Sequence, residues 1–144
     1  MTRISPCQAK VVTSYQGFAM PVRSWRDLEL RLIELARLSC LVAEALPRTT
    51  VGAHIAGQLI RSGTSAAPNY AEAQAAESRK DFIHRMRVCL KELRETHVWL
   101  YLIEGLELAN CDELQRGREE TNQLIAIFMA SIKTARRNAL RDAS

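Results

Sequence analysis

Charged side chains that could act together are concentrated between residues 58 and 100 of this 144-residue chain. Glu72, Glu92 and Glu95 stand on segments that also carry basic residues. Arg61 precedes them, and Arg94 lies between the last two. A carboxylate pair at such a place could bind a ligand or do acid–base chemistry. The interpretation that we favour is a set of ion pairs and hydrogen bonds that fixes helix register or a subunit contact.

Asn69 belongs to the same group, because it falls on the core side of the helix expected around it. An unpaired buried amide costs about 1–3 kcal/mol, so its side chain needs partners. Glu72 and Arg61 are the candidates. The sequence therefore predicts a structural polar network, whose members are Arg61, Asn69, Glu72, Glu92 and Glu95.

A second set of residues is basic and follows helical spacing. At about 100° per residue, positions 80 to 94 place five basic side chains along one solvent side of a helix. The end of the chain is basic as well, which also suits the helix dipole without any ligand. These residues form either a solvated face or a track for nucleic-acid phosphates. The predicted nucleic-acid-binding residues are Lys80, His84, Arg87, Lys91, Arg94, Lys133, Arg136 and Arg137. Base-specific readout has no support, since the sequence offers no recognition motif or aromatic platform.

Catalytic and metal-binding patterns are missing from the sequence. A di-iron bundle needs Glu-x-x-His motifs, and none is present. The histidines, at positions 54, 84 and 97, fall on other faces than the carboxylates. The RSGTS block lies within a helix rather than at a strand-to-helix turn, and Cys89 lies on a core seam where a thiol is inert. We expect no catalytic residue, no metal, no cofactor and no enzymatic activity.

The elements that carry these residues are predicted to be four helices. Few glycines and prolines favour helices over strands, and 144 residues suit one domain. The clearest pattern is a heptad-like seam at positions 82, 86, 89, 93, 96, 100 and 103. Helices are expected at about 24–46, 49–76, 78–108 and 112–140, with Pro68 kinking or loosening the second. The fold class is therefore all-α, an antiparallel up-down-up-down four-helix bundle. An irregular, flexible or loosely docked N-terminal arm at 1–24 precedes the bundle at 25–140, and a tail follows at 141–144.

Some large apolar side chains project away from the predicted inward faces. A monomeric bundle would leave them in water, so we expect a homo-oligomer. The predicted oligomer interface consists of Leu30, Leu38, Leu41, Trp99 and Leu102. No apolar run approaches the roughly 20 residues that span a bilayer, and the first residues lack a signal-peptide segment. Scattered cysteines suit reduced thiols, so we expect a cytoplasmic protein without a membrane partner.

Three stretches carry a family resemblance: QLIRSGTSAAPNYAEA, SRKDFIHRM and LKELRETHVWL. They resemble, in the same order, the typical sequence motifs of the four-helix-bundle proteins encoded within intervening sequences of 23S ribosomal RNA genes. Pro68 and Ala73 depart from the usual pattern. The resemblance covers about residues 25–139 and implies a four-helix bundle in a homo-oligomer, a pentameric ring in characterised relatives. Similar accessory proteins of diversity-generating retroelements work beside a reverse transcriptase and nucleic acid.

Two functions remain open from the sequence. The first is a non-enzymatic homo-oligomer that binds RNA or DNA through a basic surface as an accessory factor, with a reverse transcriptase or another protein as a further partner. The net charge of +4 and the pI of about 9.1 permit this without demonstrating it. The alternative is a protein–protein interaction scaffold whose charges only maintain solubility.

Overall fold

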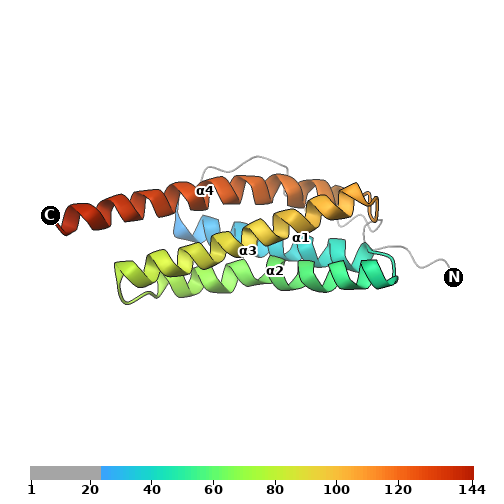
Figure 1. Ribbon diagram of the computed structural model, residues 1–144, viewed down its shortest axis with the longest axis horizontal. Helices are drawn as coiled ribbons and strands as arrows, with labels where there is room; N and C mark the ends of the chain where they lie inside the picture. The colour runs from blue at the N-terminus through green and yellow to red at the C-terminus, as the bar shows by residue number, and fades with distance from the viewer. Residues whose placement is uncertain (1–23) are drawn as a thin grey trace.

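The computed structural model describes residues 24–144, which fold into four α-helices packed as a bundle (Figure 1). The helices are α1 (Trp25–Ala45), α2 (Thr50–Gln74), α3 (Arg79–Gly105) and α4 (Asp112–Asp142). Each packs against its neighbours in the chain, and α4 returns to pack on α1. Successive helices run in opposite directions (Figure 1). The predicted up-down-up-down bundle is confirmed, whereas the predicted arm lies outside the described residues except for Ser24.

The helices begin where the sequence places capping residues. The side chains of Ser24, Thr49 and Ser78 each accept a hydrogen bond from the backbone N–H three residues on. The end of α3 comes earlier than predicted, because Glu107 adopts a positive φ of 54°. The N–H of Leu108 donates to the carbonyl of Ile103 at 3.0 Å, and that of Glu107 to Glu104 at 2.9 Å. This pattern is a Schellman motif, which closes the helix.

The other boundaries differ less from the prediction. Helix α4 continues to Asp142, so Arg141 and Asp142, assigned from the sequence to a tail, are helical. An ion pair between Arg79 and Asp142 ties this last turn to the start of α3. Helix α2 is continuous through Pro68. None of the described helices is long and apolar enough to cross a membrane.

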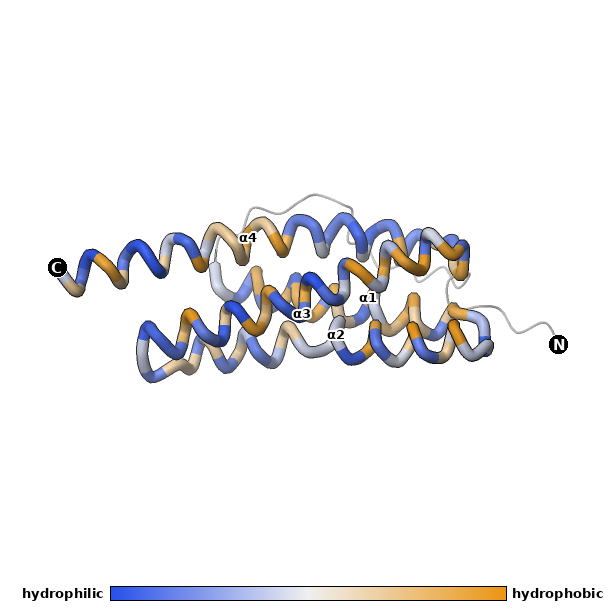
Figure 2. The backbone as a smooth tube through the Cα atoms, viewed as in Figure 1, coloured by the Kyte–Doolittle hydropathy of each residue, from blue (hydrophilic) through white to orange (hydrophobic). Residues whose placement is uncertain are grey.

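The core consists of two apolar clusters with a layer of small and hydroxyl-bearing residues between them. Along each helix, hydrophobic and hydrophilic residues alternate turn by turn (Figure 2). The α3 seam predicted from the sequence is buried from Met86 to Ile103, with Phe82 partly buried. Ser39, Ser62, Thr96 and Thr121 lie between the two clusters on their respective helices, and all four are buried. Their hydroxyls donate to carbonyls of their own helices, so the layer carries no unpaired hydroxyl.

Three positions differ from the predicted faces. Leu38, expected at an oligomer interface, is buried at 1% exposure, because its Cβ faces α4 beside Gly117. The spacing of the helix predicted at 24–46 also places Trp25 on the inward face, but Trp25 is 56% exposed at the first position of α1. Asn69 is only half-buried, and the adjacent Tyr70 occupies the core instead. The Tyr70 ring packs edge-to-face on Phe128, with centroids 5.8 Å apart.

Candidate nucleic-acid interface

The cationic side chains of the described residues divide into paired and unpaired groups. Seven arginines form ion pairs with carboxylates, most of them between two helices. Arg31, for example, binds Glu120 at 2.6 Å and so joins α1 to α4. None of the seven belongs to the predicted nucleic-acid-binding set. The paired arginines are Arg31, Arg37, Arg61, Arg79, Arg85, Arg116 and Arg118.

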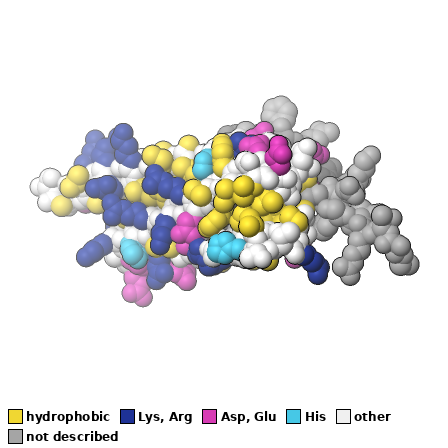
Figure 3. All heavy atoms as spheres, turned by 45° about the vertical axis from the view of Figure 1, so that its right-hand side comes forward, with side chains coloured by type: hydrophobic (Ala, Val, Ile, Leu, Met, Phe, Trp, Pro, Cys, Tyr) yellow, Lys and Arg dark blue, Asp and Glu magenta, His cyan; other side chains and the backbone are white. Residues whose placement is uncertain are grey.

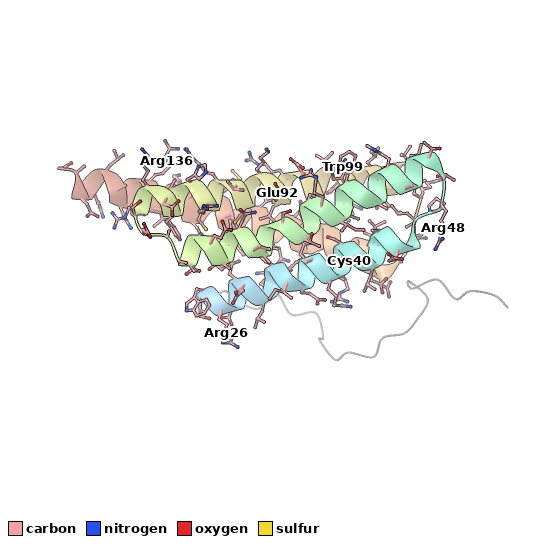
Figure 4. The ribbon with its side chains drawn as sticks, turned by 90° about the horizontal axis from the view of Figure 1, so that it is seen from below. Arg26, Cys40, Arg48, Glu92, Trp99 and Arg136 are labelled. Atoms are coloured by element: carbon pink, nitrogen blue, oxygen red, sulfur yellow. The ribbon has the colours of Figure 1, made fainter. Side chains whose placement is uncertain are left out.

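All eight predicted nucleic-acid-binding residues are exposed, and none of them forms an ion pair within residues 24–144. Arg94 donates to the Sδ of Met129 at 3.7 Å rather than to a carboxylate. Lys and Arg side chains gather over the half of this face where α3 begins and α4 ends (Figure 3). We call the eight residues the unpaired basic face. Arg26 and Arg48 also form no ion pair within residues 24–144, but they lie on the α1 side of the bundle, away from Trp99 (Figure 4).

The outer face of α3 changes character along its length. Its first half presents basic side chains, such as Lys80 and Lys91. Continuing at the same helical angle, its second half presents Val98, Leu102 and Leu106, which are 57%, 39% and 48% exposed. The hydrophobic side chains adjoin the basic ones on the visible face (Figure 3). One exposed helix face therefore joins a cationic half to an apolar half.

A shallow groove of about 620 Å³ lies where the two halves meet. Basic side chains line one part of it, and apolar side chains line the other. The lining residues are Arg87, Leu90, Lys91, Arg94, Glu95, Val98 and Trp99. Trp99 is half-buried and packs on the adjacent core cluster. His54 of α2 contacts its ring edge-to-face, with centroids 6.1 Å apart. Sequence reasoning does not predict this groove, because it assigns Arg94, Glu95 and Trp99 to three separate sets and Val98 to none.

The predicted polar network is split into two parts. Arg61 forms ion pairs with Glu95 and, at 3.6 Å, with Glu92, so it ties α2 to α3. The bond to Glu95 raises the pKa of Arg61. Glu72, expected beside Arg61, pairs with Arg85 instead. Arg85 lies near the start of α3 and Glu72 near the end of α2, so the turn between the two helices brings this pair together.

Asn69 differs from the expected pairing, and Glu92 forms its ion pair with one oxygen unsatisfied. Asn69 donates its side-chain amide to the Ser65 carbonyl of its own helix at 2.8 Å, so neither Arg61 nor Glu72 is its partner. Oε2 of Glu92 is buried and accepts no hydrogen bond, since its 3.6 Å separation from Arg61 exceeds hydrogen-bond length. The ion pairs of Arg61 and Arg85 therefore join α2 to α3, whereas the Asn69 bond stays within α2.

The predicted interface residues form patches on opposite sides of the bundle. Leu30 is 54% exposed on α1, where the exposed Ile33 adjoins it, and Leu41 is half-buried. Leu102 is exposed on α3. Helices α1 and α3 are diagonal partners, each packing on α2 and α4 (Figure 4). The chain therefore carries two apolar patches that face away from each other.

Among residues 24–144, Cys89 and the ring of Tyr101 have environments that shift their pKa values. Burial raises the pKa of the Cys89 thiol to about 12, and the thiol donates to the Ala66 carbonyl at 3.5 Å. His97 stacks beside Tyr101, with ring centroids 4.3 Å apart. Arg118 covers the Tyr101 ring, and hydrogen bonding from Arg118 lowers the pKa of that phenol. No cluster of three or more metal-ligating side chains occurs in this part of the chain.

Comparison with known proteins gives one family and one fold. The model of the 23S rRNA-intervening sequence protein family matches residues 31–130. A crystal structure at 1.70 Å of a protein of unknown function, from the S23 ribosomal protein family of Bacteroides thetaiotaomicron, is similar to this chain with a TM-score of 0.68. The two are 27% identical, over 76% of this chain and 97% of the other. No curated protein matches.

Proposed function

This chain belongs to the 23S rRNA-intervening sequence protein family, and we propose that it is a non-enzymatic homo-oligomer that binds RNA or DNA through phosphate contacts. The observation that supports this most is the separation of its cations. Seven arginines of the described residues are used in ion pairs that hold the bundle together, whereas the unpaired basic face is exposed and forms no ion pair within residues 24–144.

Unpaired cations suit a phosphate backbone for a physical reason. A cation that already neutralises a carboxylate must lose that partner before it can bind a phosphate. A solvated one only exchanges water and releases counterions from the polynucleotide, which is favourable at low salt. Contacts of this kind carry little sequence preference. The basic face thus fits an accessory factor that holds nucleic acid without reading it.

Self-assembly is the second part of the proposal. Two apolar patches on opposite sides of one chain pair head-to-tail, and head-to-tail contacts form a closed ring when the rotation between copies closes. Five copies are what the family resemblance implies. Leu30 and Ile33 of one copy would cover Leu102 and Leu106 of the next. Each copy would then contribute its basic face to a common field, which strengthens attraction for a long polyanion.

The proposal also includes a cellular location and a protein partner. We place the assembly in the cytoplasm, where thiols such as those of Cys40 and Cys111 remain reduced. A reverse transcriptase or another nucleic-acid enzyme is the protein partner implied by the resemblance. The chain itself supplies binding and no catalytic step.

Two matched double variants test the nucleic-acid proposal. Arg87→Gln with Lys91→Gln removes two charges from the basic face, and Arg26→Gln with Arg48→Gln removes two unpaired charges from the α1 side. The first pair should weaken binding of a 20-nucleotide RNA and reduce the slope of log affinity against log salt by about 1.4. The second should leave both unchanged. Equal effects of the two pairs, or no retention of RNA or DNA at low salt, would refute the proposal.

A protein-interaction scaffold is the second candidate, favoured by the exposed apolar half of α3. In that function Val98, Leu102 and Leu106 would bind another protein, and the charges would only maintain solubility. Pull-down from native lysate with and without nuclease separates the two. Partners that survive nuclease treatment and are lost in Leu102→Asp favour the scaffold, and partners released by nuclease favour nucleic-acid binding.

A further inference from the structure

We propose that the groove between the basic and apolar halves of α3 binds an unpaired base of a single-stranded polynucleotide, with Trp99 as the stacking surface. This inference rests on the proposed nucleic-acid binding and specifies its substrate class. This inference differs from the expectation drawn from the sequence, in which no aromatic platform for a base is present. The structure places the Trp99 side chain in the wall of a groove that also contains three unpaired cations.

The lining of the groove separates two kinds of contact. Leu90, Val98 and Trp99 provide apolar surface, which suits the face of a base. Arg87 and Arg94 lie seven positions apart, so they mark out about 10 Å along the helix, with Lys91 between them. Neighbouring phosphates of an extended strand can contact such a row. All the lining residues belong to α3, so the groove is open to solvent along its length and a base can reach it from the side.

Charge complementarity favours a polyanion as the occupant. Glu95 is the acidic residue in the lining, and Arg61 of α2 binds its carboxylate. The negative charge of Glu95 is therefore balanced from outside the groove. Arg87, Lys91 and Arg94 have no such balance among residues 24–144. The groove thus combines apolar surface with a net positive edge, as single-strand-binding surfaces do.

Trp99 is held in place before any ligand binds. Its ring packs on the core cluster that includes Leu59 and Leu100, and His54 contacts its edge. A side chain that is already ordered loses little conformational entropy on binding, so more of the stacking energy appears as affinity. A duplex keeps its bases stacked inside, and it can reach only the cations. The groove should therefore distinguish single strands from duplexes.

Fluorescence of Trp99 tests this directly, because the chain contains only two tryptophans. Trp25→Phe leaves Trp99 as the sole reporter and changes a residue remote from the groove. Titration with single-stranded RNA and DNA oligonucleotides should quench Trp99, and the matching duplexes should bind without quenching. Quenching by both RNA and DNA identifies base stacking as the shared chemistry, and quenching by one alone adds a contact to the sugar.

A groove variant provides the second measurement. Val98→Asp, made in the same background, places an anion in the groove without altering the buried core, and should weaken single-strand binding about tenfold. Val51→Asp, at an equally exposed valine on α2, should have a much smaller effect. Duplex affinity should fall less than single-strand affinity in Val98→Asp, because a duplex places no base beside position 98.

The outcomes separate this inference from the function on which it rests. If neither single strands nor duplexes bind at low salt, both proposals are wrong. If single strands and duplexes bind equally well and Trp99 emission does not change, only the base-binding inference is wrong. Trp99 emission that depends on protein concentration without any oligonucleotide, and is unaffected by adding one, would show that a second copy covers the groove, and would also refute it.

Discussion

Replacing Gly63 by alanine should destabilise the bundle, although alanine is the better helix former. An ideal Cβ at position 63 would lie 2.3 Å from Oγ and 2.5 Å from Cβ of Ser39 on α1. Gly63 and Ser39 are both buried in the layer between the two core clusters. Because a Cβ cannot rotate away, α1 and α2 would have to separate. Gly57, on the same helix, has no neighbour within 4 Å of its ideal Cβ and is the matched control.

The expected magnitudes follow from two opposing effects. Glycine to alanine within a helix gains about 1 kcal/mol from backbone propensity, which Gly57→Ala should show in full. Overpacking a buried site costs about 1–3 kcal/mol, and contacts this short point to the upper end. We therefore expect Gly63→Ala to lower the free energy of unfolding by about 2 kcal/mol, with Tm falling by roughly 4–8 °C.

Denaturant unfolding followed by far-UV circular dichroism measures both variants, at several protein concentrations because assembly contributes to stability. The double variant Ser39→Gly with Gly63→Ala removes both clashing atoms, so its stability should exceed the sum of the single effects by more than about 1 kcal/mol. If Gly63→Ala stabilised the protein as much as Gly57→Ala does, the close approach of α1 and α2 would be wrong.

Three further predictions concern single side chains. Glu107→Gly should stabilise the protein by about 0.5–1 kcal/mol in thermal melts, because glycine adopts the positive φ at the end of α3 without steric cost. Cys40 and Cys111 should react with a thiol reagent in the native protein, whereas Cys89 should react only on unfolding, as labelling with mass spectrometry would show. Two arginines lower the pKa of Glu34 below 4.5, so wild type should exceed Glu34→Gln in stability above about pH 4.5. This stability difference should vanish as the pH falls through the lowered folded-state pKa of Glu34. A stability difference that stays constant down to about pH 2 would contradict the prediction.

The fold was predictable from the sequence because its signals are local. Ser24, Thr49 and Ser78 mark helix starts through hydrogen bonds to their own first turns. The α3 seam follows from spacing alone, since any residue at those angles faces the same neighbours. Spacing alone places Leu38 wrongly at an oligomer interface, because its angular position on α1 lies near the edge of the inward face. Whether such a residue is covered depends on how α4 sits beside α1, which spacing does not contain.

The site was predictable in part. Exposure of the basic residues followed from helical angle, as for Lys91 and Arg94. Helical angle does not predict that these residues lack acidic partners within residues 24–144, since any arginine on a helix flank can reach a neighbouring helix. Arg85 and Arg87 are close in sequence, yet the first pairs with Glu72 and the second has no ion pair among residues 24–144. Pairing depends on the distance between helices, so only the assembled bundle separates bundle-stabilising cations from available ones.

The salt dependence of polynucleotide affinity tests the central claim, that the unpaired cations of α3 and α4 bind phosphates. If about five of them each neutralise one phosphate, affinity for a single-stranded 20-mer should fall roughly a hundredfold between about 50 and 200 mM salt. A straight line of log affinity against log salt with that steepness is the predicted result. Affinity that stays constant over the same range, or binding too weak to detect at the lower salt, would contradict the account.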